Sequence, residues 1–360
     1  MRVAITIQHP AHVHFYRHAI THLEALGHEV SVFTRDRPMA IALLNAFDID
    51  YEILTGRFDS KVEMVVNQFR YELNLVRKLR AIDPDVVTGI GGLAMSHAGT
   101  LTDTETVLFT DTEHATLSNS LAFPFADRIC TPDCYFDDIG PKQRRYPGYH
   151  ELAYLHPDRF EPDRRVLTDI GLDPDERFVV LRLLDWKAAH DIGDSGFADV
   201  DSVVDALEAT GATVFITAEG DLPESVADRQ LPVDPQQVHH LLAYADLFIG
   251  ESATMAAESA VLGTPGIYVS TIRLGYTAEL EDRYGLLHNF DGPNRESEAI
   301  RAGVSILDDY DQELWDRRRQ RLLSEKIDTT TFLLDQLMNT NSGHGISKAA
   351  QSIQPASQSN

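Results

Sequence analysis

The stretch from Gly250 to Glu258 combines small residues with a helix start and an acid. An apolar run, 247–249, precedes it, and a helical pattern follows. The first N–H groups of a helix attract phosphate, and a ligand could approach them closely at Gly250, Ser252, Ala253 and Thr254. Glu258, about one turn further on, could accept hydrogen bonds from a ribose diol. The same residues also fit an ordinary helix that Ser252 or Thr254 caps, with Glu258 on a solvated face.

A second group of candidate residues belongs to the predicted strand 178–184 and the loop after it. Arg182 interrupts the apolar run of the strand, and a buried guanidinium is costly without an anionic partner. Lys187 and His190 follow in the loop, and Lys187 is one of only six lysines in the chain. These groups suit the neutralisation of a diphosphate. An internal pair between Arg182 and one of the many aspartates is the alternative.

Histidines follow the first predicted strand, 3–7. His12 is placed to act as a general base, because the ordinary pKa of an imidazole lies near neutrality. Three more continue at helical spacing, namely His14, His18 and His22. No carboxylate completes a metal set with them, so we expect no metal here. We expect His18 and His22 to be exposed on the helix.

Acids follow another predicted strand, 106–110, in the sequence Asp-Thr-Glu-His. Glu113 is the candidate acid, because carboxyl groups beside a histidine are common in acid–base catalysis. The alternative is structural, with Asp111 or Thr112 capping the next helix.

Short β-branched runs alternate with longer amphipathic stretches, which predicts βα units around parallel sheets. The expected strands of the first half are 3–7, 29–34, 51–54, 85–90, 106–110 and 128–131, and its longest helix is 61–82. A linker at 141–162 leads to strands at 178–184, 213–217, 247–249 and 266–269. The fold class is therefore α/β, with two Rossmann-like parallel-sheet domains facing a cleft. Ligands of such sheets bind beyond the carboxyl ends of the strands.

Four regions are expected along the chain. The first domain covers 1–150 and the second covers 151–310. Helices at 311–338 are expected to pack back on the first domain. Residues 339–360 are rich in Ser, Asn, Gln and Gly and are expected to form a disordered tail.

The chain has 360 residues and a formal charge of −25, from 31 Lys and Arg against 56 Asp and Glu. Such a surface repels phosphate backbones, which excludes nucleic acid as a partner, and it also disfavours anchoring to anionic membranes. One explanation of the negative charge is an acidic face that binds a cationic partner. The acids are spread along the chain without long blocks, which favours the other, a surface adapted to a high-salt, halophilic cytoplasm. No apolar stretch is long enough for a transmembrane segment.

Several segments together resemble a largely archaeal family of unassigned function, over roughly residues 1–335. They are His12-Val-His-Phe-Tyr, Asp111-Thr-Glu-His-Ala, the stretch Tyr146–Leu155, His190-Asp191 and Gly250–Glu258. That family is itself similar to two groups of enzymes with the GT-B fold. One group is the non-hydrolysing UDP-N-acetylglucosamine 2-epimerases, and the other is the N-acetylglucosaminyltransferase that makes lipid II.

The resemblance implies roles for individual residues. Glu258 resembles the glutamate that holds the ribose of a nucleotide sugar, and His190 resembles a histidine near the diphosphate. Glu113 resembles an acid of the epimerase site. His12 is similar to a proposed base of the lipid II transferase. The first domain would then bind the acceptor and the second the nucleotide sugar.

The resemblance has two departures that bear on the reaction. Epimerases carry an Asp where this chain has Gly91-Gly92, and a second acid expected after Glu113 has no clear counterpart. Transfer needs fewer acid–base groups than epimerisation, so a glycosyltransferase acting on a glycan or lipid-linked acceptor is expected. A nucleotide-sugar 2-epimerase and a non-catalytic nucleotide-sugar binder are the alternatives. No cofactor is expected beyond the nucleoside-diphosphate sugar as substrate, and peripheral membrane association stays open.

Overall fold

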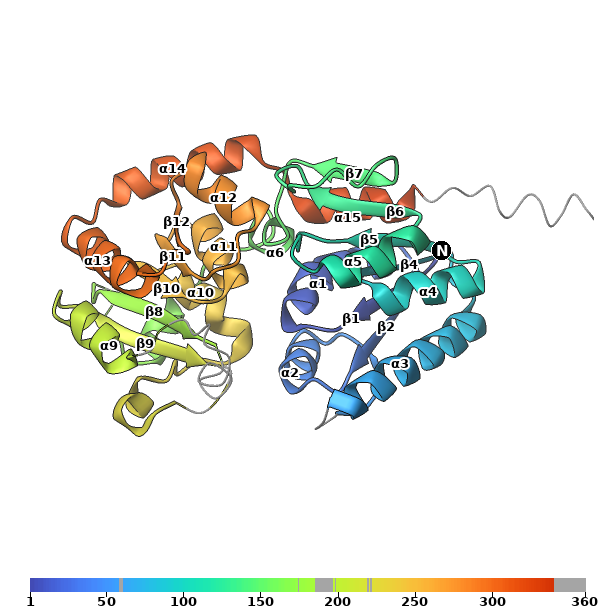
Figure 1. The fold of residues 1–360 in the computed structure, drawn as a ribbon, viewed down its shortest axis with the longest axis horizontal. Helices are drawn as coiled ribbons and strands as arrows, with labels where there is room; N and C mark the ends of the chain where they lie inside the picture. Colours follow the sequence, from blue (N-terminus) through green and yellow to red (C-terminus); the bar gives the residue numbers. More distant parts are fainter. Residues whose placement is uncertain are drawn as a thin grey trace, which may run out of the picture.

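Two parallel β-sheets, each flanked by helices, form the two halves of the molecule (Figure 1). The computed structural model describes residues 1–57, 61–173, 175–184, 197, 199–218, 220 and 222–339. Lys187 and His190 therefore lie outside the described residues, as does the predicted tail beyond Asn339.

The first sheet has seven strands in the order β3-β2-β1-β4-β5-β6-β7. Its strands are β1 (Arg2–Ile7), β2 (Glu29–Arg35), β3 (Glu52–Thr55), β4 (Val86–Ile90), β5 (Glu105–Phe109), β6 (Arg128–Pro132) and β7 (Gln143–Tyr146). The predicted strands of this half are confirmed within one or two residues. Strand β7 was missed, because at this edge of the sheet only Tyr146 is buried and the sequence Gln-Arg-Arg-Tyr carries no apolar run.

The second sheet has five strands in the order β12-β11-β10-β8-β9. Its strands are β8 (Phe178–Leu183), β9 (Thr213–Ala218), β10 (Leu247–Gly250), β11 (Gly266–Val269) and β12 (Leu287–Phe290). In this sheet the chain order reverses between β8 and β10, and in the first sheet it reverses between β1 and β4. Ligands of open parallel sheets bind beyond the strand ends at such reversal points. The ends of β8 and β10 carry Arg182 and Gly250, which are register partners.

Helices cover both sheets. In the first half they are α1 (Pro10–Ala25), α2 (Pro38–Ala46), α3 (Lys61–Ile82), α4 (Leu93–Thr102) and α5 (Thr116–Ala122). Short helices α6 (Leu152–Leu155) and α7 (Arg165–Asp169) lie between the two sheets in sequence. The second half has α9 (Val200–Glu208), α10 (Val238–Leu242), α11 (Ala253–Leu262), α12 (Gly275–Asp282), α13 (Arg295–Asp308), α14 (Gln312–Glu325) and α15 (Thr329–Met338). No helix among the described residues has both the length and the apolar content needed to cross a membrane.

The last helix returns to the first half of the molecule. Figure 1 shows α14 running along the second half, while α15 lies beside β6 and β7. Two threonines at the start of α15 fix this position, because Thr329 Oγ1 donates to the Tyr149 carbonyl and Thr330 Oγ1 to the Ala153 carbonyl, each at 2.7 Å. The two sheets are therefore connected both by the segment through α6 and by the crossing from α14 to α15.

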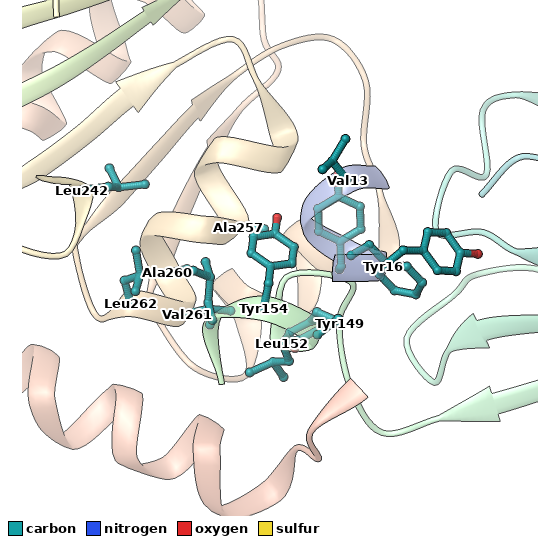
Figure 2. Close-up of a cluster of buried hydrophobic side chains, with 14 of the residues drawn as sticks. Val13, Tyr16, Tyr149, Leu152, Tyr154, Leu242, Ala257, Ala260, Val261 and Leu262 are labelled. Carbon is teal, nitrogen blue, oxygen red and sulfur yellow. The ribbon is translucent and has the colours of Figure 1, made fainter. Parts of the chain in front are cut away.

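One hydrophobic core continues from the first half into the second. It includes Phe15 and Tyr16 of α1, Tyr154 of α6 and Val261 of α11, each at most 1% exposed. Figure 2 shows the Tyr154 ring beside Ala257 and Ala260 on the face of α11. Because apolar burial is the main stabilising contribution to packing, this shared core fixes α1, α6 and α11 relative to one another. We call this contact region the domain junction.

Candidate functional site

His12 lies in the first turn of α1, just beyond the carboxyl end of β1. Its Nδ1 accepts a 3.4 Å hydrogen bond from the Gln8 backbone N–H. Burial, together with nearby His9 and His150, lowers the pKa of His12 to about 3, and the charge of Asp111 opposes this change. His12 is therefore neutral near pH 7, which is the protonation state that a general base requires. His18, further along α1, was expected to be exposed, but its Nε2 is buried and finds no partner among the described residues.

Asp111 and His150 form a buried pair beside His12. Asp111 Oδ2 lies 2.9 Å from His150 Nδ1, and the side chains are 13% and 8% exposed. Burial opposes ionisation of Asp111, but the charge and hydrogen bond of His150 outweigh it, so the pKa of Asp111 is lowered. His150 Nε2 is buried and has no hydrogen-bond partner among the described residues. A carboxylate that fixes one ring nitrogen leaves the other to exchange a proton, so the pair can assist acid–base chemistry.

Glu151 is a second acid at the same place. It is 2% exposed, and within the described part of the chain its Oε2 finds no hydrogen-bond partner. Burial raises the pKa of Glu151 well above its usual range, and the charges of Asp111 and Glu258 raise it further. This burial favours the protonated form of Glu151, which can donate a proton. We call Asp111, His150 and Glu151, together with His12, the junction cluster.

Replacing Glu151 by Gln is expected to stabilise the protein increasingly as the pH rises. The folded-state pKa of Glu151 lies above its ordinary value of 4.5, so the stability linked to its proton is fully present below that value and is lost as the pH increases. Gln does not titrate and escapes this loss. We expect Glu151→Gln to raise the Tm little at about pH 5 and by about 3 °C or more at about pH 8.

Circular-dichroism melts at both pH values measure this difference, with Glu24→Gln as the control because Glu24 is an exposed acid of α1. A Tm difference that does not change between the two pH values would show that Glu151 ionises normally.

Glu113 joins the two halves of the molecule. Its Oε1 accepts backbone hydrogen bonds from Gly275, at 3.1 Å, and from Phe136, at 3.3 Å. Gly275 begins α12, so the carboxylate caps a helix of the second half from a loop of the first. A Cβ at Gly275 would lie 2.7 Å from Glu113 Oε1 and 2.1 Å from the Cys134 carbonyl oxygen, which explains the glycine. Burial raises the pKa of Glu113, although its backbone hydrogen bonds oppose this change.

The turn between β10 and α11 has the predicted form. Ser252 caps α11, and its Oγ accepts from the Met255 N–H at 3.3 Å, so the capping alternative holds for this residue. At Gly250 a Cβ would lie 2.6 Å from the Arg182 carbonyl oxygen, so a larger residue would push β10 away from β8. Arg182 Nη1 donates to Thr217 Oγ1 at 3.0 Å. The structure thus brings Arg182 next to the start of α11.

A residue that the sequence did not single out supports the same turn. Glu251 Oε2 accepts a 2.5 Å hydrogen bond from the Leu184 N–H, and its Oε1 accepts a 3.0 Å bond from the Phe197 N–H. Burial raises the pKa of Glu251, although these two bonds favour the carboxylate. Glu251 therefore ties the turn before α11 to the chain that leaves β8.

Glu258 is 5% exposed, so the alternative of a solvated surface glutamate is wrong. Its Oε1 accepts a 2.7 Å hydrogen bond from the Tyr154 hydroxyl and lies 2.9 Å from His239 Nε2. His14 of α1 packs against both partners, with ring centroids 4.6 Å from His239 and 5.3 Å from Tyr154. Glu258 thus lies at the domain junction, and its charge reaches Glu151 of the junction cluster.

One group of described residues has the composition of a metal site. Asp133, Cys134 and Glu279 place one ligand atom each within 4.8 Å of the others. The ammonium of Lys326 already lies among them, 2.9 Å from Asp133 Oδ1 and 2.7 Å from Glu279 Oε2. Burial also raises the pKa of Cys134, which keeps its thiol protonated and a poor ligand. The group is better explained as an ion pair that joins the two halves of the molecule.

The sequence did not assign a role to His150, Glu151, Tyr154 or His239. His150, Glu151 and Tyr154 lie in the stretch Tyr146–Leu155, which resembles the archaeal family. The polar sequence Tyr-His-Glu within this stretch was the signal that could have pointed to them. Their function depends on contacts with α1 and α11, which are distant in sequence. Of the residues that were predicted, the structure brings Arg182 and Gly250 together and places Glu258 close to the junction cluster.

Solved structures with the same arrangement of two parallel-sheet domains are GT-B proteins. A Listeria monocytogenes protein assigned provisionally as UDP-N-acetylglucosamine 2-epimerase matches 100% of this chain and 99% of its own, with a TM-score of 0.67 and 14% identity. Staphylococcus aureus MnaA in complex with UDP matches 99% of this chain and 100% of its own, with a TM-score of 0.67 and 12% identity. The glycosyltransferase SsfS6 of Streptomyces sp. SF2575 matches 92% of this chain and 99% of its own, with a TM-score of 0.58 and 12% identity. These likenesses show the GT-B fold.

A sequence relative also covers most of the chain. It is the uncharacterized protein MJ0665 of Methanocaldococcus jannaschii, which is 20% identical over 304 residues, or 80% of this chain and 88% of the relative. The family model described as "Protein of unknown function (DUF354)" matches residues 1–284, which confirms the predicted resemblance. The chain therefore belongs to the DUF354 family and has the GT-B fold.

Proposed function

We propose that the protein is a metal-independent glycosyltransferase that moves a sugar from a nucleoside-diphosphate sugar to a hydroxyl acceptor. The observation that carries the proposal is the position of the junction cluster of the first half beside Glu258 of the second. Acid–base groups and a candidate ribose acceptor then belong to one site between the two domains. Enzymes with the same fold act on nucleotide sugars, which supports this choice of substrate.

The second domain would hold the donor. The N–H groups of Ser252, Ala253 and Thr254 would bind the diphosphate at the start of α11, beside Arg182. Tyr154 and His239 both use Oε1 of Glu258, so Oε2 is the oxygen proposed for the ribose diol. Lys187 and His190, outside the described residues, are proposed to complete the diphosphate site.

The first domain would bind the acceptor and supply the base. We assign this role to His12, which is neutral near pH 7 and lies close to the charge of Asp111. A bound diphosphate would add negative charge, which raises the pKa of an imidazole and makes it a better base. His12 would take the acceptor proton as the bond between the sugar and the diphosphate oxygen breaks. Glu113 would assist by holding α12 against the first domain.

The surface charge of −25 fits an enzyme of a high-salt cytoplasm. A glycan or a lipid-linked glycan is the proposed acceptor, on the lipid II resemblance. The first test is a panel of UDP-, GDP- and dTDP-sugars in molar KCl with EDTA, scoring nucleoside diphosphate released with and without cell-lipid extract. We expect one donor to be consumed faster with extract, and chelation to have no effect. If every donor stays intact under both conditions, the protein is a binder and not a transferase.

A 2-epimerase is the second candidate, and Glu151 is the observation that favours it. The sequence offered no second acid near Glu113, whereas Glu151, whose pKa is raised by burial, interacts with the charge of Asp111 in the Asp111–His150 pair. Inversion at a sugar carbon needs such an additional acid–base group. At the end of β4, however, Gly91 and Gly92 supply no side chain that could share this work.

A further inference from the structure

Three adjacent helices of the first half carry an exposed apolar surface. Figure 1 shows α4 between α3 and α5. These helices cover one side of the first sheet, because Ala4 of β1 packs in their core while Val3 and Ile5 pack in the core of α1 and α2. Eight large apolar residues on these helices and on the turn after α5 are 42% to 74% exposed, namely Val65, Val66, Phe69, Leu73, Leu101, Leu117, Leu121 and Phe125. We call these eight residues the outer face.

His97 of α4 links the parts of the outer face. Its Nδ1 lies 2.9 Å from Glu72 Oε1 of α3, and its Nε2 lies 3.1 Å from the carbonyl oxygen of Leu121 in α5. Its ring also packs edge-on against Phe125, with the ring centroids 4.8 Å apart. Phe69 lies about one turn before Glu72 on α3. The exposed residues of α3 and of α5 therefore belong to one continuous surface.

Charged residues are missing from most of this surface, although they make up 24% of the chain. Helices α4 and α5 and the turn Phe123–Phe125 contain no Asp, Glu, Lys or Arg. The exposed arginines of α3 lie at its border: Arg70 and Arg77 are on the side of α3 away from Glu72 and α4, and Arg80 is in the last turn. An anionic bilayer would favour Lys or Arg within the face. Its composition therefore suits contact with a protein better than contact with a membrane.

The outer face is large enough for a stable dimer. At roughly 150 Å² for each fully exposed side chain, the exposed fractions of the eight residues amount to about 650 Å². Monomers rarely expose a continuous apolar patch above about 300–600 Å². A standard interface buries about 800 Å² of each partner, of which roughly 60% is apolar. The outer face alone therefore provides the apolar area that such an interface needs.

From this surface we infer that the outer face docks against the same face of a second copy of the chain. Val65, Phe69 and Leu73 follow one another at a spacing of four, so they form a ridge along α3 that is symmetric about Phe69. A two-fold axis at Phe69 places this ring against Phe69 of the partner subunit. Ridges with this spacing interdigitate when two helices cross, and a two-fold dimer requires a self-complementary contact of this kind.

This dimer does not depend on the proposed transferase activity, since none of the eight residues belongs to the donor or acceptor assignment. Sedimentation velocity of the full chain, at about 1 to 100 μM, tests it without any substrate. We expect a species of twice the 40.2 kDa chain mass. The dimer should dissociate more readily at low salt, because two chains of charge −25 repel each other over a Debye length of about 10 Å in 0.1 M KCl and only about 3 Å in 1 M KCl.

Phe69→Glu should raise the dissociation constant of the dimer by about 100-fold or more, because it replaces two central aromatic rings by two like charges. Leu117→Glu, on α5, is a second variant that should also weaken the dimer. Met39→Glu is the matched control, since Met39 is an exposed apolar residue of α2 on the opposite side of the sheet. It should dimerise as the wild type does. All three positions are exposed, so circular-dichroism melts should show folded variants.

The inference is overturned if the wild type stays monomeric up to about 100 μM in molar KCl, or if Phe69→Glu and Leu117→Glu both dimerise as the wild type does. Flotation with phosphatidylglycerol vesicles examines the other occupant of the face. A wild-type monomer that floats with these vesicles, and a Phe69→Glu variant that does not, would assign the outer face to a membrane and overturn the dimer. Neither result bears on nucleotide-sugar binding at Glu258.

Discussion

Glu258→Gln should weaken the binding of the nucleoside diphosphate by about 10- to 100-fold, because a ribose diol bonds a carboxylate more strongly than an amide. Gln keeps the size of the side chain and an oxygen for Tyr154, so the fold should survive. The result is measured by isothermal titration calorimetry with UDP, GDP and dTDP, beside a melt of each variant. The ligand that binds the wild type most tightly is the one compared.

The control for this prediction is Glu313→Gln, which removes the same charge from an exposed position on α14, in the second half of the molecule. We expect it to bind nucleotide as the wild type does. Tyr154→Phe is a further variant, since it removes a hydrogen bond to Oε1 and keeps the Glu258 carboxylate. It should reduce affinity less than Glu258→Gln. Equal affinities of wild type and Glu258→Gln, at equal Tm, would remove Glu258 from the donor site.

His12→Gln is expected to lower kcat by about 10²- to 10⁴-fold, the contribution typical of a general base. The donor affinity should stay within about threefold of the wild type, because His12 is assigned to the acceptor proton and not to the nucleotide. The rate is the acceptor-dependent release of nucleoside diphosphate, and the affinity is measured by calorimetry.

His22→Gln is the matched control, as His22 is an exposed histidine on the same helix. It should leave both kcat and donor affinity unchanged. If His12→Gln retains more than about a tenth of the wild-type kcat, His12 is not the base. His150, whose Nε2 is unpaired among the described residues, would then be the next residue to test.

The local pattern of the sequence predicted most of the fold. Helix α3 has the expected bounds, Lys61–Ile82, because its apolar residues recur at helical spacing. The turn from β10 into α11 was also predicted, since an apolar run followed by small residues and a capping serine is a local signal. Strand β7 was not, because pairing with β6, and not its own composition, makes the segment a strand.

The candidate site was less accessible from the sequence. Tyr154 lies 104 residues from Glu258, and their hydrogen bond depends on how α6 packs against α11. The pairing of Asp111 with His150 likewise joins two loops of the first half. Periodicity specifies elements but not which of their polar side chains meet, so the contacts of Glu151 and His239 could not be predicted. The buried position of Glu258 was left open for the same reason.

The central claim is sugar transfer from a nucleoside-diphosphate sugar, and a proton NMR time course of the donor tests it most directly. The best donor of the panel would be incubated with enzyme in molar KCl, first alone and then with lipid extract. Our account predicts unchanged sugar signals without extract, and loss of the donor with matching appearance of nucleoside diphosphate when extract is present. Signals of a sugar epimer appearing without extract would contradict transfer and establish the epimerase.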